Sequence, residues 1–261
     1  MKFGMPTLVE CKDIYDCIEI AKKCGLDFIE INMSFPQYQP HNLDVDKLKK
    51  QMEINNIFYT IHADEMLNPF DFNPVVSDCY FSVMKDTIRF AKAVGVPVIN
   101  MHLLKGVYVT LPGKVILLSD VYFEEYVEKA KKFITMCEQE IGNSNLKIAI
   151  ENVDSNAFTE SQLKVMKYFM ESPVFKLTLD TGHELCLNFV DAHVFEKYPD
   201  KLIHMHLHDA VGKSAHLPLG TGEVDINKKL SQHKGDTCLI EVKTIDGLFK
   251  SVEYMKKKNI L

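Results

Sequence analysis

The sequence predicts a closed (β/α)₈ barrel, and three observations support this prediction. Strand-like and helix-like segments alternate along the whole chain and give eight strand–helix units in 261 residues. No linker or low-complexity stretch interrupts them, so we expect a single domain over residues 1–261. An open doubly wound sheet fits less well, because no glycine-rich phosphate loop follows the first strand and Gly220-Thr221-Gly222 is too short to be one.

Each expected strand is a short aliphatic or β-branched run, and each expected helix has apolar residues at helical spacing. The first helix shows the pattern, since Ile14, Cys17, Ile18 and Ala21 repeat every three or four positions and Gly25 stops it. In chain order, strands are expected at 3–8, 28–33, 58–64, 97–104, 148–153, 176–180, 202–208 and 238–242. Helices are expected at 13–24, 45–54, 77–94, 122–141, 160–170, 192–198, 226–231 and 248–257.

Single residues mark the ends of the two longest helices. Ser77 is a side chain that can cap a helix start, so we expect the third helix to begin there. Gly95 is expected to end that helix, and Gly142 to end the helix over 122–141.

Composition excludes several classes of protein. Hydrophobic residues make up 46% and charged residues 25%, which is typical of a soluble globular chain. The net charge of -6 and the lack of a basic block give no support to nucleic-acid binding. No apolar run is long enough for a membrane helix, and the first residues do not resemble a signal peptide. Seven scattered cysteines without a Cys-x-x-Cys pair indicate reduced thiols and a cytoplasmic location.

The most informative segment is Ile203–Asp209, which reads Ile-His-Met-His-Leu-His-Asp. On a strand, alternate side chains face opposite sides, so its three histidines share one face. Other strands carry an acid or imidazole near their C-terminal end, at His62, His102, Glu151, Asp180 and Glu241. In a barrel these groups would meet where the active sites of this fold lie. Burying so many ionisable groups would be costly without a cation, so we expect a bound divalent metal.

These motifs resemble those of the xylose-isomerase-like barrel superfamily, which contains sugar isomerases, sugar epimerases and endonuclease IV. The resemblance covers essentially the whole chain. It is carried by Ile150-Glu151-Asn152, Leu179-Asp180-Thr181-Gly182-His183, His206-Leu207-His208-Asp209, His216-Leu217-Pro218-Leu219-Gly220-Thr221-Gly222 and Ile240-Glu241.

The resemblance to the epimerases and isomerases implies one divalent ion (Zn, Mn, Mg or Co). Its ligands would be Glu151, Asp180, His206 and Glu241. The resemblance also implies that Glu151 and Glu241 are catalytic and move the proton, and that His183 contacts substrate. One departure concerns the segment after Asn152, which reads Val-Asp-Ser-Asn without the substrate-binding glutamate of the best-known epimerases.

The resemblance to endonuclease IV implies additional ligands. Its extra histidines match four positions that could hold a second metal or the substrate: His62, His102, His183 and His216. Its last aspartate falls at Ser214, which is a poor zinc ligand, so we expect one or two metals instead of three.

Three other polar residues belong to the same region. His204 is expected to lie deeper in the barrel in a structural role. His208 and Lys243 would lie above the metal, where they could hold substrate oxygens or be plain rim residues.

The leading hypothesis is a metal-dependent isomerase or epimerase of a small sugar or sugar-derived substrate that stabilises an enediolate. A dehydratase with the same chemistry lies in this class. The first alternative is an endonuclease IV-like zinc phosphoesterase acting on abasic DNA, the only case in which nucleic acid is a partner. The second is a barrel that binds a ligand without turnover. No membrane partner is expected, and the oligomeric state is open.

Overall fold

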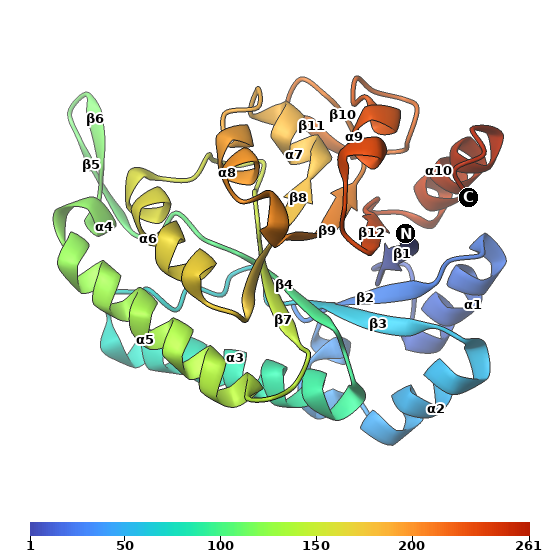
Figure 1. Ribbon diagram of the computed structural model, residues 1–261, viewed down its shortest axis with the longest axis horizontal. Coiled ribbons are helices and arrows are strands. Elements are labelled where there is room, and N and C mark those ends of the chain that lie inside the picture. The colour runs from blue at the N-terminus through green and yellow to red at the C-terminus, as the bar shows by residue number, and fades with distance from the viewer.

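Eight parallel strands close into a barrel in the computed structural model, which describes residues 1–261 (Figure 1). Around the barrel the strand order is β1-β12-β9-β8-β7-β4-β3-β2. Their bounds are β1 Lys2–Pro6, β2 Phe28–Asn32, β3 Phe58–His62, β4 Val98–His102, β7 Lys147–Glu151, β8 Phe175–Asp180, β9 Leu202–Leu207 and β12 Thr237–Ile240. The predicted fold class is therefore confirmed.

The α-helices surround the barrel on its outside (Figure 1). The outward-facing side chains of the strands form part of the buried hydrophobic core. Ile148 and Ile150, the aliphatic neighbours of Glu151, are fully buried in the layer between strands and helices. The helix bounds are α1 Ile14–Cys24, α2 Val45–Asn55, α3 Pro74–Val94, α4 Leu118–Val121, α5 Phe123–Ile141, α6 Glu160–Glu171, α7 Thr181–Cys186, α8 Ala192–Lys197, α9 Ile226–Gln232 and α10 Ile245–Lys257. Three short 3₁₀ turns cover Pro36–Tyr38, Pro40–Asn42 and Pro199–Lys201. None of the helices combines the length and the hydropathy that a membrane crossing requires.

The helix ends agree with the glycine signals but not with Ser77. Gly25 and Gly95 follow α1 and α3 in the left-handed conformation, with φ of 75° and 93°, and Gly142 follows α5. The predicted start at Ser77 is wrong, because α3 begins at Pro74 and its cap is Asn73. Proline has no N–H to satisfy and is suited to the first helical position, so the helix starts one turn earlier.

Seven of the eight strands end earlier than the sequence predicts, whereas β8 ends at Asp180 as predicted, and this affects the site. β3, β4 and β7 end at His62, His102 and Glu151, so each of these side chains occupies the last position of its strand. Glu241 lies one position beyond β12. The polar groups therefore lie at the rim of the barrel where the loops begin.

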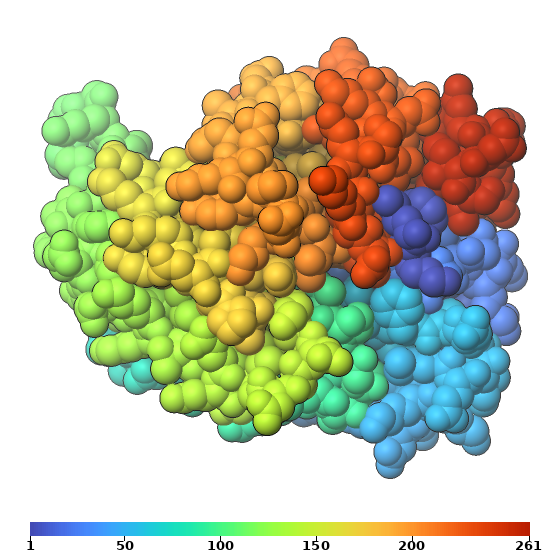
Figure 2. Space-filling view, in the orientation of Figure 1, coloured from blue at the N-terminus to red at the C-terminus, as the bar shows by residue number.

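Two antiparallel hairpins were not predicted. The first, β5 (Tyr108–Leu111) and β6 (Lys114–Leu117), projects from the barrel after β4 (Figures 1 and 2). Its turn is Pro112-Gly113, and the glycine has φ of 78°. The Pro-Gly dipeptide is a turn signal in the sequence from which this hairpin could have been predicted. The second, β10 (Asp209–Val211) and β11 (Ser214–Leu217), follows β9 directly.

Asp209 connects this second hairpin to the glycine-containing loop that follows. Its carboxylate accepts hydrogen bonds from the backbone N–H groups of Gly220, Gly222 and Val224 at 2.9, 2.8 and 3.0 Å. Gly222 has no room for a side chain, because a Cβ there would lie 2.4 Å from Asp209 Oδ1. These contacts with Asp209 account for the Gly220-Thr221-Gly222 motif without a bound phosphate.

Replacing Asp209 with alanine should leave these backbone donors without their acceptor. We expect the free energy of unfolding to fall by at least about 2 kcal/mol, measured by urea denaturation. Asp225→Ala is the matched control, since Asp225 accepts only from the start of α9 and its loss should cost about 1 kcal/mol. Equal losses in the two variants would contradict this role.

Candidate metal centre

The four residues predicted to hold a metal converge at the C-terminal end of the barrel. His206 Nδ1 lies 2.9 Å from Glu151 Oε1, 2.8 Å from Glu241 Oε2 and 3.9 Å from Asp180 Oδ2. One ligand atom from each residue lies within 4.8 Å of all the others, and all four residues are buried. The strands β7, β8, β9 and β12 that deliver them are consecutive around the barrel.

The chemistry of this group fits a divalent cation. His206 Nδ1, Glu151 Oε1 and Glu241 Oε2 are buried, and none of them makes an aligned hydrogen bond despite the short distances between them. Buried polar atoms without partners are rare, because each costs free energy. Carboxylate oxygens with one imidazole nitrogen form a donor set that suits Mn²⁺, Co²⁺, Zn²⁺ or Mg²⁺.

Neighbouring side chains keep both glutamates ionised. Burial alone would raise the pKa of Glu241, but the Lys243 ammonium, 2.7 Å from Glu241 Oε1, and the imidazole of His206 outweigh it and hold the pKa well below its usual range. Burial likewise opposes ionisation of Glu151, yet the imidazoles of His206 and His102 keep its pKa well below its usual range. Both side chains are therefore carboxylates, which is the form that can ligate a metal.

Glu30 of β2 is a site residue that the sequence reasoning missed. We call Glu151, Asp180, His206 and Glu241 the metal group. The Glu30 carboxylate is buried beneath this group, with Oε1 3.0 Å from His206 Nε2. Its Oε2 accepts from the Thr60 hydroxyl at 2.8 Å and lies 3.2 Å from His204 Nε2. His204 also contacts the Thr237 hydroxyl at 2.6 Å, so it has the structural environment expected for it deeper in the barrel.

The sequence does contain a signal for Glu30, but this acid lies at a different position along its strand from the other acids. It has the inward phase of its strand, like the other acids, but it lies in the middle of Phe-Ile-Glu-Ile-Asn and not at the end. A search for polar residues at strand ends passes over it.

His62 and His102 form a second group around the other oxygen of Glu151. Their Nε2 atoms lie 3.4 and 3.2 Å from Glu151 Oε2. His62 Nδ1 is 2.8 Å from the Ala63 carbonyl, so it donates there and turns Nε2 toward the carboxylate. Burial lowers the pKa of His62, but Glu151 outweighs burial and raises it to about 9. The amide of Asn100 also donates to Glu151 Oε2.

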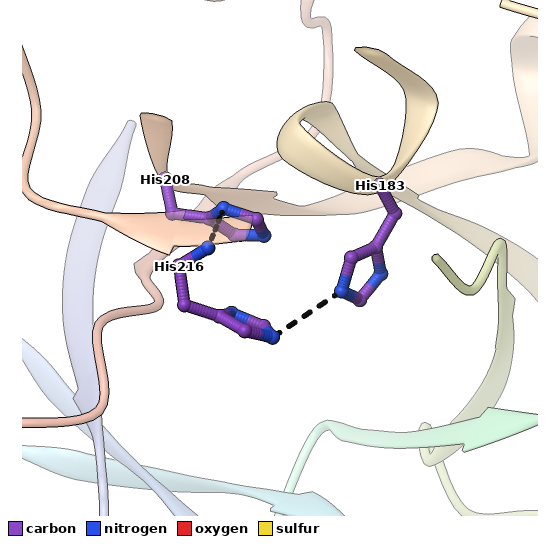
Figure 3. Close-up of side chains that lie close together, drawn as sticks. All are labelled: His183, His208 and His216. Carbon is purple, nitrogen blue, oxygen red and sulfur yellow. Dashed lines mark hydrogen bonds between the residues drawn. The ribbon is translucent and has the colours of Figure 1, made fainter. Parts of the chain in front are cut away.

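His183, His208 and His216 form a third group (Figure 3). Asp180 lies next to it, with Oδ1 2.9 Å from His208 Nε2. His183 Nδ1 donates to the Asn152 carbonyl at 3.0 Å, and its Nε2 lies 3.4 Å from His216 Nε2. His208 is fully buried, and both of its ring nitrogens have partners within the protein: Nε2 lies 3.0 Å from Asp180 Oδ2, and Nδ1 accepts from the His216 N–H at 2.8 Å. Ser214, which matches the missing aspartate, is exposed on β11.

Comparison with known proteins gives a family for this barrel. A family model described as a xylose isomerase-like TIM barrel matches residues 18–258. The chain belongs to this family.

Relatives and solved structures align with this chain over nearly its full length. The uncharacterized protein MJ1614 of Methanocaldococcus jannaschii is 25% identical over 276 residues, which cover 98% of this chain and 99% of the relative. A solved structure described as a D-tagatose 3-epimerase-like protein has a TM-score of 0.79 and 24% identity, covering 100% of this chain and 98% of that chain. The IolI protein, solved with a zinc atom, has a TM-score of 0.74 and 17% identity, covering 100% and 98%. At these identities the structural likeness shows the shared fold.

A cavity of about 310 Å³ opens beside the metal group of this family member. Its polar wall contains Asn32, His62, Glu65, Glu241 and Lys243. This volume lies at the lower end of the range for small-molecule sites, which begins at about 300 Å³. A larger cleft of about 440 Å³ holds none of the predicted site residues.

We expect one metal per chain, and the pair His62→Ala and His102→Ala tests this number. Glu151 Oε2 already accepts from Asn100, which weakens the case for a second ion between it and the two histidines. The double variant should keep the metal stoichiometry of the wild type, measured by elemental analysis, while binding of substrate weakens. Two ions in the wild type and one in the double variant would contradict this expectation.

Proposed function

We propose that this chain is a divalent-metal-dependent isomerase or epimerase of a small sugar or sugar-derived substrate. The observation that supports it most is the convergence of Glu151, Asp180, His206 and Glu241, with three ligand atoms that have no aligned hydrogen bond. The adjacent cavity is the right size and polarity for a small polyhydroxylated molecule. The epimerase names of several structural neighbours agree with this class of reaction.

The protein side chains have separate tasks in this proposal. Glu151, Asp180, His206 and Glu241 would hold a divalent ion, which would supply Lewis acidity to stabilise negative charge on substrate oxygens. Glu151 and Glu241 stand three strands apart in the barrel order, so they can reach a molecule between them from different sides and transfer the proton as base and acid. Lys243 neutralises the outer oxygen of Glu241, which leaves the inner oxygen for the reaction centre.

The rim residues serve to hold the substrate. His183 is fixed by Asn152 through Nδ1, which leaves Nε2 as an acceptor beside His216. Lys243 and His62 line the cavity and offer polar atoms at its wall. His208 has no such role here, because both of its nitrogens have partners inside the protein.

A phosphoesterase of the endonuclease IV kind is the second candidate, and the grouping of His62 and His102 around Glu151 favours it. Metal pairs clamp the oxygens of a transferring phosphate. The distribution of arginine argues against it, since the chain's one arginine, Arg89, lies on α3 and binds Glu140 by two hydrogen bonds. No guanidinium is therefore available to form a bidentate contact with a phosphodiester.

The deciding experiment combines metal content with two substrate panels. The purified protein is analysed for metals, then assayed on ketoses and aldoses and on an oligonucleotide with an abasic site. One metal per chain with sugar turnover supports the isomerase or epimerase. Two or three zinc ions with strand cleavage would replace it with the phosphoesterase, and binding of sugars without turnover would indicate a ligand-binding barrel.

A further inference from the structure

His208 is a fully buried residue that contacts a predicted metal ligand from outside the metal group. Its Nε2 lies 2.9 Å from Asp180 Oδ1 and 3.0 Å from Asp180 Oδ2. The residue follows the last position of β9, two residues after His206, and lies against α7. No other side chain in the structure donates a hydrogen bond to the Asp180 carboxylate with this geometry, although the backbone N–H of His183 does so at 2.7 Å.

The hydrogen bonds of His208 determine which nitrogen carries its proton. The backbone N–H of His216 points at His208 Nδ1 at 2.8 Å, so Nδ1 is an acceptor (Figure 3). A neutral imidazole then has its proton on Nε2, and it donates that proton to Asp180. Nδ1 also lies 3.1 Å from the Asp209 carbonyl, and a doubly protonated ring could donate there. In both states Nε2 is the donor toward Asp180.

Two unusual features of the chain make this arrangement possible. His216 has φ of 56°, a left-handed conformation that is unfavourable for a non-glycine residue. The imidazole ring of His216 packs against that of His208, with the ring centroids 4.3 Å apart. At Gly182, a Cβ would lie 2.0 Å from His208 Cε1, so only glycine leaves room for the imidazole. The left-handed backbone of His216 and the absence of a side chain at Gly182 therefore both position the His208 ring.

These contacts argue against a metal held by His183, His208 and His216 together. A metal ligand must offer a lone pair, but Nδ1 of His208 accepts from His216 and Nε2 donates to Asp180. Binding an ion would break one of these buried hydrogen bonds. The remaining histidines, His183 and His216, would then be only two protein ligands, fewer than the three or four that zinc sites use.

We propose that His208 is a positioning residue, which holds the carboxylate of Asp180 in place for the metal through an Nε2–H hydrogen bond. The inference rests on the proposed metal centre. Groups that support metal ligands in this way fix their orientation, and their loss usually costs about 10–100-fold in metal affinity. The hairpin β10–β11 is then part of the centre, because it supplies the backbone N–H that sets the tautomer of His208.

A matched pair of variants tests the role of the N–H group. His208→Gln and His208→Met have side chains of similar length, but only glutamine can donate to Asp180. We expect His208→Met to weaken zinc binding by about 10–100-fold in a competition titration with a chromophoric chelator. His208→Gln should bind zinc close to the wild-type affinity. Thermal unfolding of the metal-free proteins, followed by circular dichroism, reports separately on folding.

The outcomes separate positioning from packing. Wild-type zinc affinity in the folded His208→Met variant would overturn the proposal, as would equal weakening in both variants. If the methionine variant does not fold, histidine-selective ¹⁵N NMR of the zinc-loaded wild type decides, because the proposal requires a protonated Nε2 at His208. An unprotonated or zinc-bound Nε2 would overturn it. A wild-type protein that binds no zinc, manganese or cobalt would overturn the metal centre itself, together with the proposed function.

Discussion

Replacing Asp180 with alanine is expected to remove most of the bound metal while the barrel remains folded. The carboxylate is one of four converging ligands, and its loss leaves Glu151 and Glu241 to share the ion with a single imidazole. We expect affinity to fall by more than the roughly 100-fold that loss of a supporting group costs. His206→Ala should have the same effect, because His206 supplies the central nitrogen. Elemental analysis of the purified variants measures it.

Asp180 also caps α7, and this requires a control. Its side chain accepts from the His183 N–H at 2.7 Å, so the alanine variant loses a cap worth about 1 kcal/mol as well. Asp44→Ala removes a comparable cap from α2, away from the metal group. The Asp44→Ala variant should keep its metal, although its free energy of unfolding falls by an amount similar to the cap loss in Asp180→Ala. Unchanged metal content in both Asp180→Ala and His206→Ala would refute the ligand assignment.

Shortening either glutamate by one methylene is expected to abolish turnover without removing the metal. Glu151→Asp and Glu241→Asp keep the charge but withdraw the carboxylate by about 1.5 Å. A misplacement of about 1 Å can cost on the order of 10²-fold in rate, so proton transfer should fall at least that far. Metal content should stay close to one ion per chain, because an anionic oxygen remains near the centre.

Exchange with solvent deuterium distinguishes a base from a ligand. On a confirmed sugar substrate, the wild type should exchange the hydrogen next to the carbonyl, and both aspartate variants should lose this exchange together with turnover. Glu253→Asp, an exposed change on α10 in an ion pair with Lys257, should leave both activities as they are. Wild-type exchange in Glu151→Asp or Glu241→Asp would mean that this glutamate is only a ligand.

The sequence predicts the metal group because strand periodicity determines it. A parallel strand of a barrel presents alternate residues inward, and the last inward residue lies at the C-terminal rim. This rule places Glu151, Asp180 and His206 near each other without knowledge of any distance. The rule predicts the position of Glu241 less directly, because β12 ends one residue earlier and the backbone after the strand directs that side chain inward.

The supporting residues could not be predicted, because they depend on tertiary contacts. The role of His208 follows from the position of one backbone N–H, and that position depends on the left-handed conformation of His216 in a hairpin with weak strand signals. Glu30 has an acidic side chain in the middle of an apolar strand, and only the closed barrel shows that it faces His206. The start of α3 was misplaced because Asn73 and Pro74 together outweigh Ser77.

The closing strand β12 has a consequence for what a bound ion would hold together. The sheet closes where β12 pairs with β1, with Thr237 beside Lys2 and Leu239 beside Gly4. Glu241 follows directly on β12, whose other edge pairs with β9, where Leu239 lies beside His206. An ion held by the four ligands would therefore tie this closing strand to β9, β8 and β7 and not to β1. At a free concentration a thousand times its dissociation constant the ion would add about 4 kcal/mol to the free energy of unfolding, and a chelator would remove this contribution.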